Sequence, residues 1–134
     1  MGYILLMAYL EGLNDAQKRA VLATRGPISV LAGAGSGKTR VLTTRIYHLI
    51  REGVSANKIL AVTFTNKAAR EMRSRVEAML DGDSAAPFIS TFHGLGRELL
   101  QSYGKIIGIS RYFSVYDRDD SEKAIAVALK ALDV

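Results

Sequence analysis

Residues 32–39, "AGAGSGKT", form the stretch whose residue types could do chemistry, and that chemistry is the binding of a polyphosphate. They fit the phosphate-loop (Walker A) pattern G-x-x-x-x-G-K-[ST], with a small alanine in place of the first glycine. Glycines in such a loop allow left-handed backbone angles and a close approach to the ligand. The loop N–H groups, at the start of a helix, then form a positively charged nest for phosphate oxygens. The predicted nucleotide-binding loop consists of Ala32, Gly33, Ala34, Gly35, Ser36, Gly37, Lys38 and Thr39.

The last two residues of this loop carry the reactive groups. Lys38 would place a cation on the β- and γ-phosphates, and the hydroxyl of Thr39 would be a ligand of Mg²⁺. We therefore expect ATP and Mg²⁺ as cofactors, with Lys38 and Thr39 as the catalytic residues. A glycine-rich turn that merely precedes a helix is the alternative. The apolar run before the loop, the helical pattern after it and the "GKT" ending argue against that alternative.

A phosphate loop is only part of a hydrolytic site, which also needs a carboxylate on a neighbouring strand to hold Mg²⁺. Asp117, at the end of "YFSVYD", is the candidate in this sequence. Ser114 and Tyr116 interrupt the apolar run before it, so a capping or turn role for Asp117 is the favoured interpretation. No Asp-Glu pair follows any other apolar run. We expect the chain by itself to bind nucleotide and to hydrolyse it slowly or not at all.

Strand and helix patterns alternate around these residues and would position them. Asn14 and Gln17 have the spacing of a capping box at the start of a helix over 13–24. Short apolar runs predict strands at 28–32, 58–63, 88–91 and 112–117. Helical patterns cover 38–53, the stretch to 80 after an Asn66 cap, 94–104 and 118–134, and residues 81–87 have the composition of a linker. This alternation predicts an α/β fold, a parallel sheet flanked by helices.

Composition sets wider limits on the chain. Its 134 residues suit one domain, and with 49% hydrophobic and 23% charged residues it has the balance of a globular protein. It has no cysteine, which excludes disulfides and thiolate metal sites. The net charge of +5 suits a polyanionic partner such as nucleic acid, and equally an ordinary basic surface. No apolar run approaches the roughly 20 residues that cross a bilayer, so we expect a cytoplasmic protein. Residues 1–11 are interpreted as an N-terminal extension or leader.

Four sequence motifs, taken together, indicate a protein family. They are "LNDAQKRAV" (13–21), "AGAGSGKTR" (32–40), "AVTFTNKAAREM" (61–72) and "STFHGLGRELL" (90–100). In this order they resemble superfamily 1 DNA helicases of the UvrD/Rep/PcrA type, over most of residues 12–120. In that family the N-terminal RecA-like domain, 1A, is split in sequence by an inserted helical subdomain, 1B. The resemblance implies that residues 12–134 are a partial, RecA-like domain 1A that ends near the start of 1B.

The same resemblance implies what the parent protein does. It would be an ATP-dependent helicase or translocase that acts on single-stranded DNA and on junctions of single- and double-stranded DNA, in DNA repair or replication. Its missing carboxylate, its subdomain 1B and its domains 2A and 2B would lie in other parts of the parent. The isolated fragment is therefore expected to be inactive.

Roles for individual residues follow from the resemblance. Gln17 matches a glutamine that reads the edge of adenine, and Arg40 matches an arginine beside the base. The residues that match two DNA-contacting loops are Phe64, Thr65 and Asn66 in the first, and Thr91, Phe92 and His93 in the second. From the residues alone, other roles stay open: Gln17 as a capping-box partner, Phe64 as a core residue and His93 as an ordinary loop residue.

Two alternatives to the helicase come from different functional classes. One is a self-contained small phosphate-loop protein that binds nucleotide or transfers phosphoryl groups with Asp117, and it predicts turnover without DNA. The other is a non-catalytic nucleotide-binding module that regulates a partner.

Overall fold

The computed structural model describes residues 7–80, 85–116 and 118–132. The chain forms two compact units that divide between Leu95 and Gly96. Asp117, the candidate acid, lies outside the described residues, as does most of the predicted linker.

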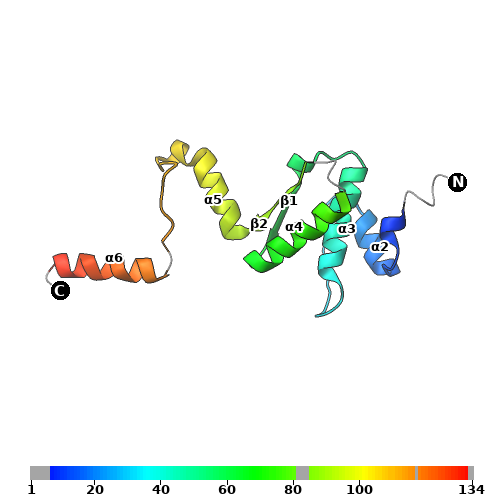
Figure 1. The fold of residues 1–134 in the computed structure, drawn as a ribbon, viewed down its shortest axis with the longest axis horizontal. Coiled ribbons are helices and arrows are strands. Elements are labelled where there is room, and N and C mark those ends of the chain that lie inside the picture. The colour runs from blue at the N-terminus through cyan, green and yellow to red at the C-terminus, as the bar shows by residue number, and fades with distance from the viewer. Residues whose placement is uncertain (1–6, 81–84, 117, 133–134) are drawn as a thin grey trace. The chain divides into compact units, whose positions relative to one another are not determined.

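The first unit alternates helices and strands (Figure 1). A short 3-10 helix, η1 (Ala8–Leu10), precedes α2 (Asp15–Leu22) and α3 (Lys38–Arg51). They are followed by η2 (Ala56–Lys58), β1 (Leu60–Thr63), α4 (Asn66–Leu80), β2 (Phe88–Thr91) and the first turn of α5 (Phe92–Tyr103).

The sheet of the described residues is the parallel pair β1–β2, with Leu60 opposite Phe88 and Thr63 opposite Thr91. α4 is the crossover between the two strands, and it packs against both of them. Parallel strands need such a crossover, since their ends lie far apart. The predicted α/β fold with parallel strands is confirmed to this extent.

Apolar side chains of α3, α4 and the sheet form the main core of this unit. Its buried members are Ile46, Ile59, Met72, Val76, Leu80 and Ile89. A second buried cluster joins η1 and α2 to α3 through Leu10, Leu13, Val21 and Val41. The second cluster lies beside the glycine loop that precedes α3, so it supports the elements around that loop.

Val76 is fully buried in the main core. We expect Val76→Ala to lower the free energy of unfolding by about 2 kcal/mol, since two buried methyl groups are lost and a small cavity remains. Urea unfolding checks this value. Val30→Ala is the matched control, because Val30 is 52% exposed and its truncation removes little buried surface. Equal losses in both variants would contradict this assignment of the core.

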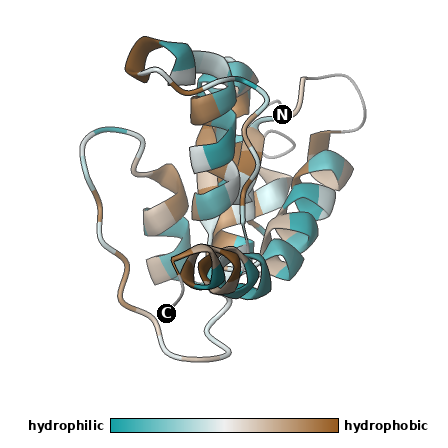
Figure 2. Cartoon of the chain, turned by 90° about the vertical axis from the view of Figure 1, so that its left-hand side faces the viewer, coloured by the Kyte–Doolittle hydropathy of each residue, from teal (hydrophilic) through white to brown (hydrophobic). Residues whose placement is uncertain are grey.

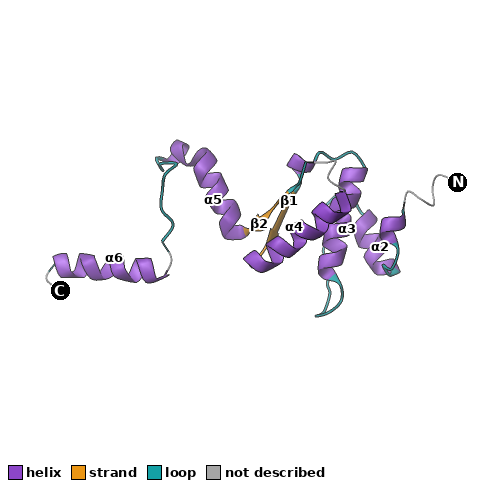
Figure 3. Cartoon of the chain, in the orientation of Figure 1, coloured by secondary structure: helices purple, strands orange, loops and turns teal. Residues whose placement is uncertain are grey.

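Two predicted strands are absent from the structure, namely 28–32 and the described part of 112–117 (Figure 3). Strand geometry persists where backbone groups pair with a neighbouring strand. Among the described residues, no backbone hydrogen bond joins 28–32 to β1 or β2. Leu31 is 97% exposed and Tyr112 is 84% exposed. The strand prediction was wrong for these two apolar runs, because neither pairs with a strand in the part of the chain that the structure describes.

The capping residues were predicted correctly at one helix and wrongly at another. Asn14 and Gln17 form the predicted capping box at the start of α2, with both hydrogen bonds at 2.9 Å. At α4 the cap is Thr65 rather than Asn66, because the Thr65 hydroxyl accepts a hydrogen bond from the N–H of Ala68 at 3.1 Å. Asn66 is the first residue of the helix itself.

The second unit consists of the rest of α5, η3 (Gly104–Ile107) and α6 (Arg118–Ala131). α6 carries both hydrophobic and hydrophilic residues (Figure 2), and its Ile125 and Val127 are 59% and 71% exposed. None of the helices in the described ranges combines the length and apolar character that a membrane span requires.

Candidate functional site

The glycine loop turns sharply before α3. Gly35 and Gly37 have φ values of 71° and 79°, which lie in the left-handed region that favours glycine. Gly37 is the residue that precedes the first turn of α3. Gly33 does not have a left-handed φ, so that expectation was wrong for this glycine. The turn directs the chain into the N-terminus of α3, where the first N–H groups of a helix have no partner within it.

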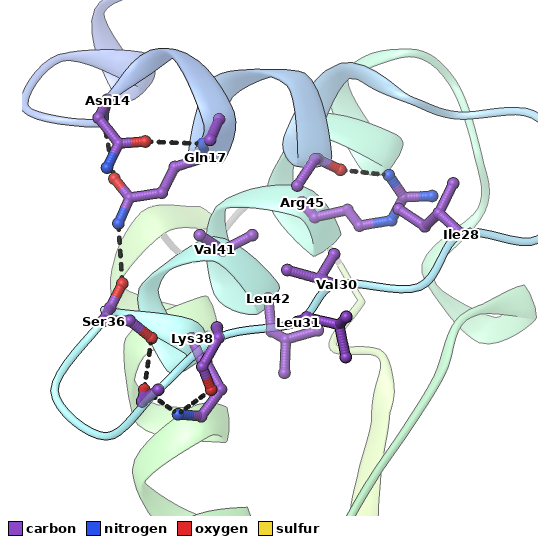
Figure 4. A pocket seen from close by; sticks show the side chains of 14 residues that line it. Asn14, Gln17, Ile28, Val30, Leu31, Ser36, Lys38, Val41, Leu42 and Arg45 are labelled. Carbon is purple, nitrogen blue, oxygen red and sulfur yellow. Dashed lines mark hydrogen bonds between the residues drawn. The ribbon is translucent and has the colours of Figure 1, made fainter.

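The side chains of the loop are bonded to its own backbone (Figure 4). The ammonium of Lys38 donates to the carbonyl oxygens of Ala32 and Gly33, at 3.2 and 2.6 Å. The hydroxyl of Ser36 donates to the Gly33 carbonyl at 2.7 Å. Lys38 thus lies over the loop, with its charge held at the entrance to α3. A phosphate group at this entrance would meet the ammonium and the N-terminus of the helix together.

Gln17 connects α2 to this loop. Its Nε2 donates to the carbonyl of Ser36 at 3.0 Å, while its Oε1 accepts from the N–H of Asn14. A Cβ added to Gly37 would stand 3.0 Å from the same Nε2. The predicted adenine-reading glutamine therefore lies at the loop and is also the capping-box partner, so the two interpretations of Gln17 are compatible.

Arg40 lies in the first turn of α3, and its side chain reaches back to the residues before α2. Its Nη2 donates to the carbonyl of Glu11 at 2.8 Å. The guanidinium also lies against Gly12, where an added Cβ would be 2.8 Å from Nη2. The structure thus brings Gln17, Arg40 and the glycine loop together around the start of α3.

A pocket of about 710 Å³ opens between α2, residues 28–36 and α3. Its lining is mostly apolar, and Gln17, Ser36 and Lys38 supply polar groups beside the loop (Figure 4). Its volume falls within the range of small-molecule sites.

A pair of aromatic rings marks the carboxyl ends of the two strands. Phe64 directly follows β1, and Phe92 directly follows β2. Their ring centroids are 5.4 Å apart with the planes inclined by 54°. Phe64 is 90% exposed and Phe92 is 53% exposed, so Phe64 is not a core residue. Open α/β sheets bind ligands at this edge, beyond the carboxyl ends of the strands.

The predicted second DNA-contacting loop is replaced by a helix start. Phe92 and His93 are the first two residues of α5 rather than loop residues, and both are exposed. Thr91 is buried, and its hydroxyl accepts from the N–H of Gly94 at 3.1 Å. The helix begins at once because the Thr91 hydroxyl satisfies a first-turn N–H group. Two capped helix N-termini, those of α4 and α5, therefore lie at the ends of the two strands.

The residues that could hold a metal ion are few in this structure. Within the described ranges, no group of three or more His, Asp or Glu side chains converges on one point. Thr39, in the first turn of α3, is the hydroxyl group next to the loop lysine. A hydroxyl is a suitable oxygen donor to Mg²⁺ beside phosphate oxygens.

Sequence reasoning missed one set of contacts at the end of α3 that lies away from the loop. Tyr9 Oη and His48 Nδ1 are 2.6 Å apart, and His48 is 4% exposed. Burial first, and then the carboxylate of Glu52, raise the pKa of Tyr9. These residues are 39 positions apart, and no spacing rule connects them.

The chain matches known proteins along most of its length. The model of the UvrD/REP helicase N-terminal domain matches residues 13–134. A "Probable DNA helicase II homolog" of Mycoplasma capricolum is 47% identical over 126 residues, which are 93% of this chain and 18% of that protein. "ATP-dependent DNA helicase PcrA" of Leuconostoc citreum is 51% identical over 109 residues, 80% of this chain and 15% of the relative.

A third relative extends the match along the chain. "ATP-dependent DNA helicase PcrA" of Staphylococcus epidermidis is 44% identical over 128 residues, 95% of this chain and 18% of that protein. The chain thus spans less than a fifth of the length of these relatives. Because the family model covers nearly the whole chain, the chain belongs to the UvrD/REP helicase N-terminal domain family.

Proposed function

We propose that this chain is the ATP-binding, DNA-contacting N-terminal part of an ATP-dependent DNA helicase or translocase. The observation that supports this most is the arrangement at the start of α3. There the left-handed Gly35 and Gly37 precede a helix N-terminus that carries the Lys38 ammonium. The relatives named above carry the words "DNA helicase" in their names. The ATP-dependent helicase or translocase activity of the whole protein is likewise proposed.

The triphosphate of ATP would bind where Lys38 lies now. In this structure the ammonium contacts the carbonyls of Ala32 and Gly33. Phosphate oxygens carry more negative charge than carbonyl oxygens, so they would draw the ammonium to themselves. The N-terminus of α3 adds its positive end, equivalent to about half an elementary charge. Gln17 and Arg40 would then lie on the base side of the nucleotide.

Single-stranded DNA would bind at the carboxyl ends of β1 and β2. The exposed rings of Phe64 and Phe92 can stack bases of any sequence. The hydroxyl of Thr65 already accepts a bond from Ala68, but its own proton can still be donated to a phosphate oxygen. The N-termini of α4 and α5 add further attraction for the DNA backbone. His93 and Asn66 are exposed at the same two helix starts, whereas the buried Thr91 would position Phe92.

The proposed helicase couples these two sites through a second RecA-like lobe. An arginine from that lobe would complete the site for phosphoryl transfer, as arginine fingers do. We therefore expect the 134-residue chain to bind ATP with little turnover and no stimulation by oligonucleotides. Fast, DNA-independent hydrolysis by this chain would instead favour a self-contained enzyme.

Thr39 provides the test of the metal site. Since its hydroxyl would be a Mg²⁺ ligand, we expect Thr39→Ala to lower the affinity for Mg²⁺–ATP by about tenfold. Binding of ATP in the presence of a chelator should change little, because the phosphate contacts of the loop remain.

Thr39→Ser is the matched control for this experiment. It keeps the hydroxyl and should bind Mg²⁺–ATP almost as the unchanged chain does. Fluorescence anisotropy with a labelled ATP analogue, with and without Mg²⁺, measures both affinities. If Thr39→Ala lost the same affinity with and without the metal, Thr39 would not be a metal ligand.

A further inference from the structure

Residues Ala8–Leu13 form a segment, here named the N-terminal strap, that packs against α2 and α3. Leu10 and Leu13 are 6% and 5% exposed. They belong to the buried cluster with Val21 of α2 and Val41 of α3. The strap is therefore an ordered part of the first unit and holds α2 and α3 to each other.

Side chains of α3 bond to the strap at two places. His48, in the last turns of α3, is bonded to Tyr9, whose ring also meets Tyr47 edge-on with centroids 5.1 Å apart. Arg40, in the first turn, donates to the Glu11 carbonyl at 2.8 Å. The strap thus spans from the end of α3 to the turn that follows the phosphate loop.

Gly12 is the position in the strap where a side chain does not fit. Its φ of +73° lies in the left-handed region. A Cβ at this residue would come within 2.8 Å of Arg40 Nη2 and 3.4 Å of Nη1. Any side chain at Gly12 would therefore strain the turn and also push the guanidinium off the Glu11 carbonyl.

The strap continues directly into the start of α2. Asn14 follows Leu13 and forms the capping box with Gln17, and Gln17 donates to Ser36 in the loop. The residues that the proposed function gives to the adenine base, Gln17 and Arg40, are therefore both fixed by this short stretch of backbone. The phosphate contacts of Lys38 come from the loop instead.

We propose that the strap positions the base-binding side of the ATP site, with Gly12 holding open the place of the Arg40 guanidinium. This proposal rests on the proposed function, since it assigns the base side of the same site. A guanidinium anchored by one N–H group keeps its other donors and its flat face for a purine. Loss of the anchor should weaken binding of the base and leave binding of the triphosphate.

The experiment compares two ligands and two glycine variants in the full 134-residue chain. The ligands are ATP and inorganic tripolyphosphate, which has no base. Gly12→Ala should weaken ATP binding by about tenfold, the effect of a charge-assisted hydrogen bond, and change tripolyphosphate binding by less than about twofold.

Gly26→Ala is the matched control. Gly26 has the same φ of +73°, but nothing lies within 4 Å of its added Cβ. It carries the same backbone strain without displacing Arg40, so it should change neither affinity. Isothermal titration calorimetry measures both ligands, and thermal melting shows whether each variant is folded.

Tyr9→Phe tests the other end of the strap without any backbone strain. It keeps the ring against Tyr47 and removes the hydroxyl that contacts His48. We expect a smaller loss, about threefold, again for ATP alone. If Gly12→Ala or Tyr9→Phe weakened both ligands equally, or neither, the strap proposal would be wrong. If the unchanged chain bound neither ligand, the proposed ATP site itself would fail.

Discussion

Replacing Lys38 with alanine is expected to abolish measurable binding of ATP. The ammonium lies over the loop, within hydrogen-bonding distance of the carbonyls of Ala32 and Gly33. Several charge-assisted hydrogen bonds to the triphosphate would be lost together, so affinity should fall by at least about a hundredfold. Titration of a fluorescent ATP analogue measures the change.

A control variant at another lysine shows whether ATP binding depends on the loop contact of Lys38 or only on the charge of the chain. Lys58, in η2, is also exposed, and Lys58→Ala removes the same charge from another part of the surface. This variant should keep its affinity within about twofold, since salt screens distant surface charges. Unchanged affinity in Lys38→Ala, or equal losses in the two variants, would contradict the assigned phosphate site.

Replacing Phe64 with alanine should weaken the binding of single-stranded DNA and leave ATP binding nearly unchanged. The ring is 90% exposed and follows the carboxyl end of β1, away from the main core. Loss of one stacking contact costs about 1–3 kcal/mol, which is roughly a 5- to 150-fold weaker affinity. Anisotropy with a labelled oligothymidine measures DNA binding. In the full-length protein, DNA-stimulated ATP hydrolysis should fall in parallel.

Phe88 supplies the control for this second prediction. It is partly exposed like Phe92, but it begins β2 rather than following its end. Phe88→Ala should leave DNA affinity unchanged. Phe92→Ala should weaken DNA binding, and its effect should not add to that of Phe64→Ala, because the two rings are in contact. A joint loss of ATP and DNA binding in Phe64→Ala would mean that the ring supports the fold instead.

Local signals in the sequence predicted most of the helices and the surroundings of the loop. The capping box of Asn14 and Gln17 acts within a few residues and is therefore readable. The strands β1 and β2 are readable for the same reason, as short apolar runs. The exposure of Phe64 was open from the residues alone, because an aromatic residue after a strand is compatible with core and surface alike.

Most of what failed depends on distant partners, whereas the cap of α4 failed for a local reason. Residues 28–32 and 112–116 have strand-like composition, but a strand forms through the segment beside it. The cap at α4 moved by one residue because the Thr65 hydroxyl reaches Ala68 and replaces Asn66 in that role. The bond between Arg40 and Glu11 joins residues 29 positions apart, and His48 is buried because Tyr9 gives it a partner. The helix and strand periodicities of the sequence do not predict such long-range contacts.

The contact between the two phenylalanine rings has a consequence for how a nucleobase could dock. Intercalation between the rings would separate a pair whose mutual contact is worth about 0.5–1.5 kcal/mol. A base that stacks on the outer face of Phe64 leaves the contact between the two rings intact. A strand moving past would thus be held by one base at a time, and each base could be released without reopening the pair. Under the proposed function, such a weak, sequence-neutral contact would let a translocating helicase release each base in turn.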